Sequence, residues 1–163
     1  MPWHTVEPVC DYVVIRGLCG KPYPNHPRGC PNIGKKTRCP PKAPLLHEVI
    51  ALEHPVWAVW NAYPLGEHMD EMKRRHPQWT ERQLRNPLYW QGRARKHLRE
   101  EIRKFCRLDG TPPKVVGCPE ACGCNLTATM KQAGIPLLWP PQRVAYQIVL
   151  VGWPVHKAIP DAR

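Results

Sequence analysis

Eight cysteines in proline-rich surroundings constrain this chain more than any other feature of its sequence. They form one group near each end: Cys10, Cys19, Cys30 and Cys39, then Cys106, Cys118, Cys122 and Cys124. Many of the chain's 21 prolines lie in the same two stretches, and proline fixes φ and removes a backbone hydrogen-bond donor. We therefore expect both stretches to be irregular loops that their cysteines hold in place.

The redox state of the cysteines depends on the compartment in which the protein resides. Residues 1–8 lack the basic stretch and long apolar run of a secretory leader. The longest apolar stretch, 148–153, is far shorter than the roughly 20 residues that cross a bilayer. We therefore expect a cytoplasmic protein without membrane contact. Thiols stay reduced there, which favours metal ligation over disulfide bonds.

A thiolate metal site gathers ligands from distant segments, because a soft metal needs several sulfurs at about 2.3 Å. The spacings match neither the paired CxxC knuckles of a zinc ribbon nor a bacterial ferredoxin run. Prolines stand beside several of the cysteines, as they do around iron–sulfur clusters. An iron–sulfur cluster is therefore favoured over zinc. The predicted ligands are the cysteines of the Pro/Gly-rich loops: Cys19, Cys30, Cys39, Cys118, Cys122 and Cys124.

The remaining candidates near these loops have weaker support. Cys10 and Cys106 each adjoin a segment with regular periodicity, which favours an inert packing role for them. His26 lies beside the first loop and is a further ligand candidate. Backbone N–H groups near four glycines are expected to donate to cluster sulfurs: Gly29, Gly34, Gly117 and Gly123.

The segments between the cysteine groups carry regular periodicity. β-branched and apolar runs predict strands at 12–15, 56–60 and 144–151. Helical spacing predicts helices at 45–53, 67–75, 88–105 and 126–133. Thr80 and Gln83 form a capping-box pattern, and Asn125 is a candidate N-cap. We expect a small α/β or α+β single domain over residues 1–163, with a short sheet and several helices. Its Cys/Pro loops, at 1–44 and 107–141, would form one metal site at one end.

The formal charge of +11 favours polyanionic partners or serves solubility. Much of it lies on the predicted helix at 88–105, outside its apolar face of Ala94, Leu98, Ile102 and Phe105. This exterior carries Arg93, Arg95, Lys96, Arg99, Arg103 and Lys104. Two interpretations remain open. Either the helix contacts nucleic acid, with Tyr89 and Trp90 stacking on bases, or the aromatics pack into the core while the charges stay solvated.

Other patterns for chemistry are sparse. His68 and His76, among Glu67, Asp70 and Glu71, form either a His/carboxylate metal site or a solvated helix face. Cys122 or Cys124 as a nucleophile ranks below ligation. The sequence contains no glycine-rich phosphate loop, HExxH zinc-protease motif or GxSxG serine motif, and it specifies no reaction.

Two motifs carry a resemblance to a known family. Residues 29–41 read Gly-Cys-Pro-Asn-Ile-Gly-Lys-Lys-Thr-Arg-Cys-Pro-Pro, and the second cysteine group is followed by Met-Lys-Gln-Ala-Gly-Ile-Pro at 130–136. The chain resembles the predicted metal-binding proteins of the uncharacterised family DUF2284, which have a Cys, a YGK-type turn and a closing Cys-Pro-Pro. The resemblance covers both ends, whereas the middle departs from it. It implies metal binding, of iron–sulfur type, and no particular reaction.

These observations predict a cysteine-ligated metal protein with one iron–sulfur cluster, of the 4Fe-4S type. Its role would be structural, redox or sulfur-handling, with a redox partner in the second case. The alternative is a zinc-stapled basic module that binds nucleic acid or another polyanion through the helix at 88–105, without catalysis.

Overall fold

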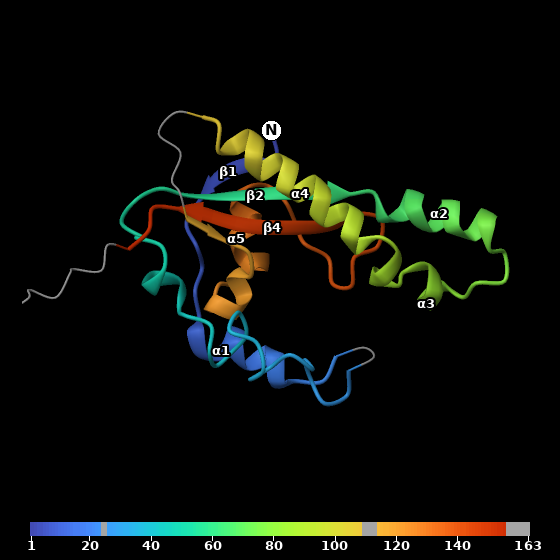
Figure 1. The fold of residues 1–163 in the computed structure, drawn as a ribbon, viewed down its shortest axis with the longest axis horizontal. Helices are drawn as coiled ribbons and strands as arrows, with labels where there is room; N and C mark the ends of the chain where they lie inside the picture. The colour runs from blue at the N-terminus through green and yellow to red at the C-terminus, as the bar shows by residue number, and fades with distance from the viewer. Residues whose placement is uncertain (24–25, 109–113, 156–163) are drawn as a thin grey trace, which may run out of the picture.

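The computed structural model describes residues 1–23, 26–108 and 114–155. Within them the chain forms an α+β domain built on a four-stranded antiparallel sheet with strand order β1-β2-β4-β3, which confirms the expected fold class (Figure 1). The strands are β1 (Trp3–Val6), β2 (Val56–Tyr63), β3 (Lys114–Val116) and β4 (Ala145–Gly152).

The two central strands correspond to the two apolar runs that predicted strands at 56–60 and 144–151. β2 and β4 pair from Trp57 opposite Val151 to Tyr63 opposite Ala145. β4 is buried over nearly its whole length, because both faces of the sheet are covered. The edge strands β1 and β3 were not predicted, since four and three residues are too few for a recognisable alternation.

Five helices and four short 3₁₀ segments connect the strands in the described part of the chain. The helices are α1 (Tyr12–Gly17), α2 (Leu65–Arg75), α3 (Glu81–Leu84), α4 (Gln91–Phe105) and α5 (Leu126–Gln132). The 3₁₀ segments are η1 (Leu18–Gly20), η2 (Leu46–Glu48), η3 (Pro87–Tyr89) and η4 (Pro119–Cys122). The predicted caps are present: Thr80 and Gln83 form the capping box of α3, and the Asn125 side chain accepts from the Ala128 N–H (3.0 Å).

Two predictions of secondary structure were wrong. In both segments, contacts that residue propensities do not include decided the conformation. The β-branched run at 12–15 is helical, because Asp11 caps it by accepting from the Val14 N–H (2.9 Å). The predicted helix at 45–53 is reduced to η2, because Ile50 pairs with Pro154 beside β4. Long-range pairing overrides helical spacing in a segment this short.

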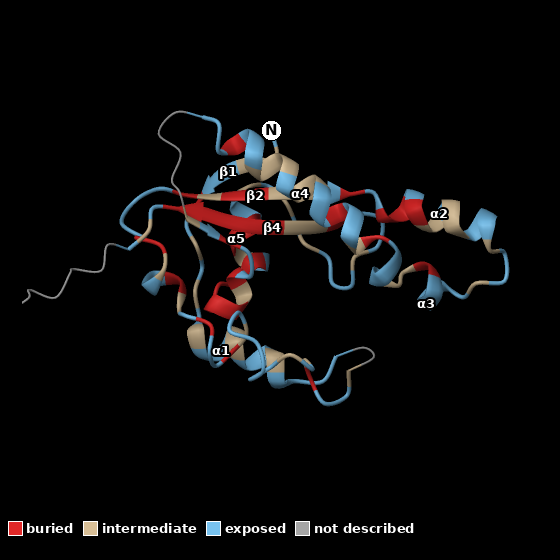
Figure 2. Ribbon diagram, viewed as in Figure 1, coloured by how far each residue is buried: buried red, intermediate tan, exposed pale blue. Residues whose placement is uncertain are grey.

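The core has a layer on each face of the sheet. On one face α4 packs its predicted apolar side, from Ala94 to Phe105, against β2 and β4. Trp3 and Trp57 flank Phe105 with ring centroids 5.8 Å away. On the other face α5, η2 and η4 contribute the side chains that cover Leu150. Figure 2 shows the buried residues concentrated along the two central strands and the elements that cover them.

The N-terminal cysteine segment lies beyond α5, on the side away from the sheet (Figure 1). There α1 packs against η4, so the loops at 1–44 and 107–141 meet. The Arg16 guanidinium, on α1, donates to the carbonyls of Pro41 (2.9 Å) and Ala43 (2.8 Å) and ties the proline-rich loop to the helix. None of the helices described is long and apolar enough to span a bilayer.

The central strand β4 provides a test of the core. Leu150 is fully buried, so Leu150→Ala leaves a cavity, and the free energy of unfolding is expected to fall by about 2–5 kcal/mol in urea titrations. Val13→Ala is the control, because that side chain is 85% exposed and its loss should change stability by less than about 0.5 kcal/mol. Equal losses in the two variants would contradict this core assignment.

Candidate metal centre

Cys19, Cys30 and Cys124 line one hollow, and α1 packs against η4 beside it. Cys19 lies in η1, and its carbonyl accepts from the Cys30 N–H (2.8 Å). Cys39 ends the loop that Cys30 begins. Cys118 caps η4 and Cys122 is its last residue.

Glycine is required at position 29, where the segment of Cys30 crosses the segment of Cys19. Gly29 has a φ of +77°, and a Cβ there would lie 2.8 Å from the Cys19 carbonyl oxygen and the Gly20 backbone. Gly34, with a φ of +70°, donates its N–H to the Pro40 carbonyl (2.7 Å) and closes the loop from Cys30 to Cys39. The loop that carries these two cysteines is therefore shaped by its own backbone.

The cysteines of this neighbourhood affect one another electrostatically. Burial raises the pKa of Cys19, and the negative charges of Cys30 and Cys39 raise it further. Burial also raises the pKa of Cys118, with Arg38 opposing it and Glu120 and Cys39 adding to it. For Cys122, burial is again the largest cause of a raised pKa, followed by the charge of Cys118. Cys39 thus links the N-terminal cysteines to those of η4.

Cations oppose this accumulation of negative charge. Arg16 lowers the pKa of Cys19 and of Cys122, against the larger effect of burial, and Arg38 does the same for Cys118. Sequence reasoning missed Arg16, which directly follows the segment 12–15 that was predicted as a strand. It missed Glu120 as well, a carboxyl whose own pKa is raised by burial beside these thiols. The sequence could have indicated Glu120, because it lies between Cys118 and Cys122.

Cys124, the sixth predicted ligand, is paired with Cys10. The two residues form an isolated antiparallel bridge. Cys124 is fully buried, its sulfur lies 3.5 Å from the Thr129 hydroxyl, and burial raises its pKa to about 12. It also borders the hollow lined by Cys19 and Cys30. Cys106 is the exposed C-cap residue of α4.

Three of the four glycine N–H groups expected to reach cluster sulfurs are bonded to backbone oxygens instead. Gly29 donates to His26 (3.0 Å), Gly34 to Pro40, and Gly123 to Glu120 (3.0 Å). These hydrogen bonds close turns, which is the commoner use of a glycine with positive φ. The His26 ring packs on Tyr23 with a centroid separation of 4.6 Å, and its backbone pairs with the same residue.

The His/carboxylate group predicted on α2 is dispersed among other partners. His68 is buried, and Asp70 binds Arg143 (3.1 Å). Glu71 pairs with Arg75, and His76 stacks on Trp79 at 4.2 Å. Nowhere in residues 1–23, 26–108 and 114–155 do three or more His, Cys, Asp or Glu side chains form a group that could hold a metal ion.

The aromatic pair before α4 is divided between surface and core. Trp90 is buried and stacks on Tyr63 at 5.4 Å, and its indole N–H donates to the Arg85 carbonyl (3.1 Å). Tyr89 is half exposed and contacts Trp79. The packing interpretation therefore holds for Trp90, while the basic side chains of α4 are exposed.

Comparison with family models, with curated proteins and with solved structures gives no match for this chain. The site is therefore argued from its own geometry.

His68 makes a pH dependence testable. Burial and the charge of Arg93 lower its pKa, and its Nε2 has no partner among the described residues. The unfolded chain therefore binds a proton at His68 more readily than the folded chain does. The free energy of unfolding falls as pH drops below about 6.5, the pKa in the unfolded state, toward the lower pKa in the folded state. His68→Leu should flatten the fall in unfolding free energy between pH 7 and pH 5, measured by urea denaturation. The control is His54→Leu at an exposed position, which should keep the wild-type slope.

Proposed function

We propose that this protein holds one iron–sulfur cluster of the 4Fe-4S type, ligated by Cys19, Cys30, Cys39 and Cys118. The observation that carries the proposal is the meeting of the two cysteine segments, because α1 packs against η4 and the Cys30 N–H donates to the Cys19 carbonyl (2.8 Å). Together these segments carry the four thiols that such a cluster takes. Cys122 stands beside Cys118 as a fifth thiol.

Two cations lie near these thiols: Arg16 acts on Cys19 and Cys122, and Arg38 acts on Cys118. Arg16 and Arg38 supply positive charge that offsets the net negative charge of a thiolate-ligated cluster.

Each structural device of the site has a role under this proposal. Arg16 fixes the loop that follows Cys39, and Gly29 lets the backbone of the Cys19 and Cys30 segments cross. When bound, the cluster would supply a structural link or one-electron transfer, and its binding would couple to folding because it joins both ends of the chain. The eight cysteines are free thiols, which accords with the cytoplasmic location that we include in the proposal.

A zinc-stapled module that binds nucleic acid or another polyanion is the second candidate. The observation that favours it is the set of exposed basic side chains along α4, which includes Arg95, Lys96 and Arg99. The same four cysteines would then hold a single ion, after their loops moved closer together. Metal analysis separates the two candidates.

Protein purified without oxygen is expected to be brown, to absorb near roughly 400 nm, and to contain about four irons and four sulfides per chain. Cys39→Ala should lose most of this iron, because one of four ligands is gone while the backbone hydrogen bonds at that position persist. Cys106→Ala is the matched control and should keep the wild-type content, since Cys106 is exposed at the end of α4. Colourless protein with one zinc per chain, or full iron in Cys39→Ala, would refute the assignment.

A further inference from the structure

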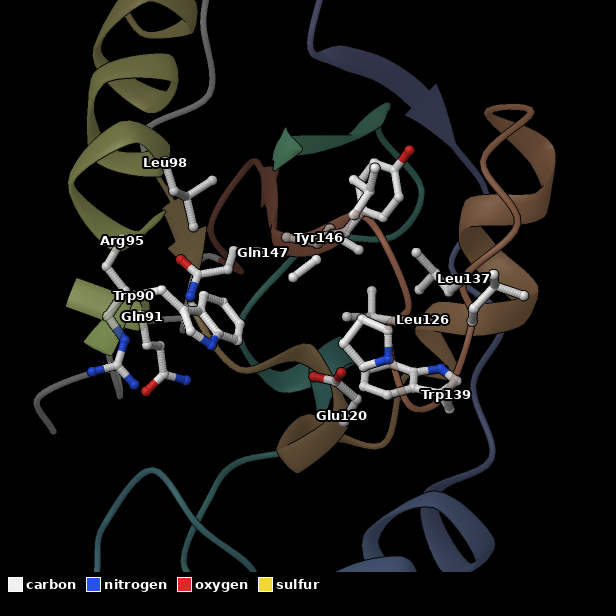
Figure 3. A pocket seen from close by; sticks show the side chains of 16 residues that line it. Trp90, Gln91, Arg95, Leu98, Glu120, Leu126, Leu137, Trp139, Tyr146 and Gln147 are labelled. Atoms are coloured by element: carbon white, nitrogen blue, oxygen red, sulfur yellow. The ribbon is translucent and has the colours of Figure 1, made fainter. Parts of the chain in front are cut away.

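A cavity of about 390 Å³ lies between α4 and the segment that follows α5 (Figure 3). Trp90 and Gln147 lie on one side of it, Trp139 and Leu126 lie on the other, and the Glu120 carboxyl lies between them. Sites for small molecules have this size and this mixture of aromatic walls with a few polar groups. None of the proposed metal ligands lines the cavity, so a ligand there does not require the cluster.

Both tryptophans are held in position before any ligand arrives. Trp90 is stacked on Tyr63, and its indole N–H is bonded to the Arg85 carbonyl. Trp139 donates its indole N–H to the Thr127 hydroxyl (3.0 Å), yet the residue is 68% exposed. An indole that is fixed but uncovered presents a ready surface for stacking a planar ring, at little cost in side-chain entropy.

The polar side chains at the cavity and beside it differ in whether they have hydrogen-bond partners. The Gln147 Oε1 atom is buried and has no hydrogen-bond partner among the described residues. Its neighbour across the strands, Asn61, is satisfied, because its amide donates to the Ala94 carbonyl (3.1 Å). A buried amide oxygen without a partner is uncommon in proteins. The Gln147 side chain therefore has an unused acceptor at the cavity wall.

The mouth of the cavity is positively charged. Arg95 lines it from α4, is exposed, and forms no ion pair with any residue in the described ranges. Further exposed basic residues, Lys96 and Arg99, continue along the same helix. A guanidinium with free donors suits a phosphate, which it binds through two parallel hydrogen bonds.

We propose that this cavity binds a purine nucleotide, with its base between Trp90 and Trp139 and its phosphate on Arg95. Stacking on indole rings suits any base, while the glutamine amide can pair with the N6 and N7 edge of adenine. The exposed basic residues beyond Arg95 favour a phosphate chain over a simple aromatic acid. The nucleotide has two sources, a free mononucleotide or a base of an RNA strand that continues along α4.

The proposal is tested by titrating the full-length protein, as purified without oxygen, with AMP, UMP, adenosine and a short oligoadenylate, and by measuring binding with calorimetry and tryptophan fluorescence. AMP is expected to bind about tenfold or more tightly than adenosine, because the phosphate adds charge-assisted hydrogen bonds. Arg95→Gln should abolish that difference, while Gln147→Met should weaken AMP and adenosine alike and remove the preference of the site for AMP over UMP. Arg74→Gln, an equal charge change at an exposed position of α2, should leave AMP affinity within about twofold.

The outcomes divide clearly. AMP that binds as tightly as oligoadenylate identifies a free nucleotide, whereas tighter and steeply salt-dependent binding of oligoadenylate identifies RNA, and both support the base site. The proposal is overturned if no probe binds saturably up to about 1 mM, or if Arg95→Gln and Arg74→Gln have equal effects. Iron content is measured in every variant. Loss of nucleotide binding with full iron, or the reverse, therefore separates this proposal from that of the metal centre.

Discussion

A short antiparallel pairing between residues 9–11 and 123–125 joins the N-terminal cysteine segment to the segment that follows η4. The Asp11 N–H donates to the Gly123 carbonyl (3.0 Å), and the Asn125 N–H donates to the Val9 carbonyl (2.7 Å). Between these bonds Cys10 faces the buried Cys124. Gly123 must be glycine, because its φ is +88° and a side chain would collide with Tyr12. This pairing positions α1, and the Arg16 hydrogen bonds in turn fix the N-terminal cysteine loop against that helix.

The metal centre that we propose follows from this junction. It places α1 against η4, and so brings the N-terminal cysteine segment to the segment that carries Cys118 and Cys122. The loop between Cys30 and Cys39 has little regular structure of its own, but backbone bonds at its glycines and the reach of Arg16 give it a defined shape. Such a site is partly organised before the metal arrives, which lowers the conformational entropy that metal binding must overcome.

The segment after Val116 contributes residues to both candidate sites, the metal centre and the cavity. Cys118 faces the cysteine loops, whereas Gly117 and Glu120 border the cavity beneath α4. Trp139 and Leu126 border both this cavity and the hollow beside Cys19 and Cys30. A nucleotide in the cavity would therefore lie close to the cluster, and the basic exterior of α4 would serve its phosphates instead of acting only as a solvated surface.

The sequence by itself determined the elements whose signals are local or repeated. These are β2 and β4, from continuous apolar runs, the apolar face of α4, and the caps at Thr80 and Asn125. It also shows two cysteine groups, whose convergence on one metal stays a prediction. Only the tertiary structure decided that Cys124 pairs with Cys10, that 12–15 is a helix, and that Arg16, Glu120 and Gln147 lie at the candidate sites. Those outcomes depend on contacts between residues far apart in the chain, and neither propensity nor spacing encodes which distant backbone a side chain will meet.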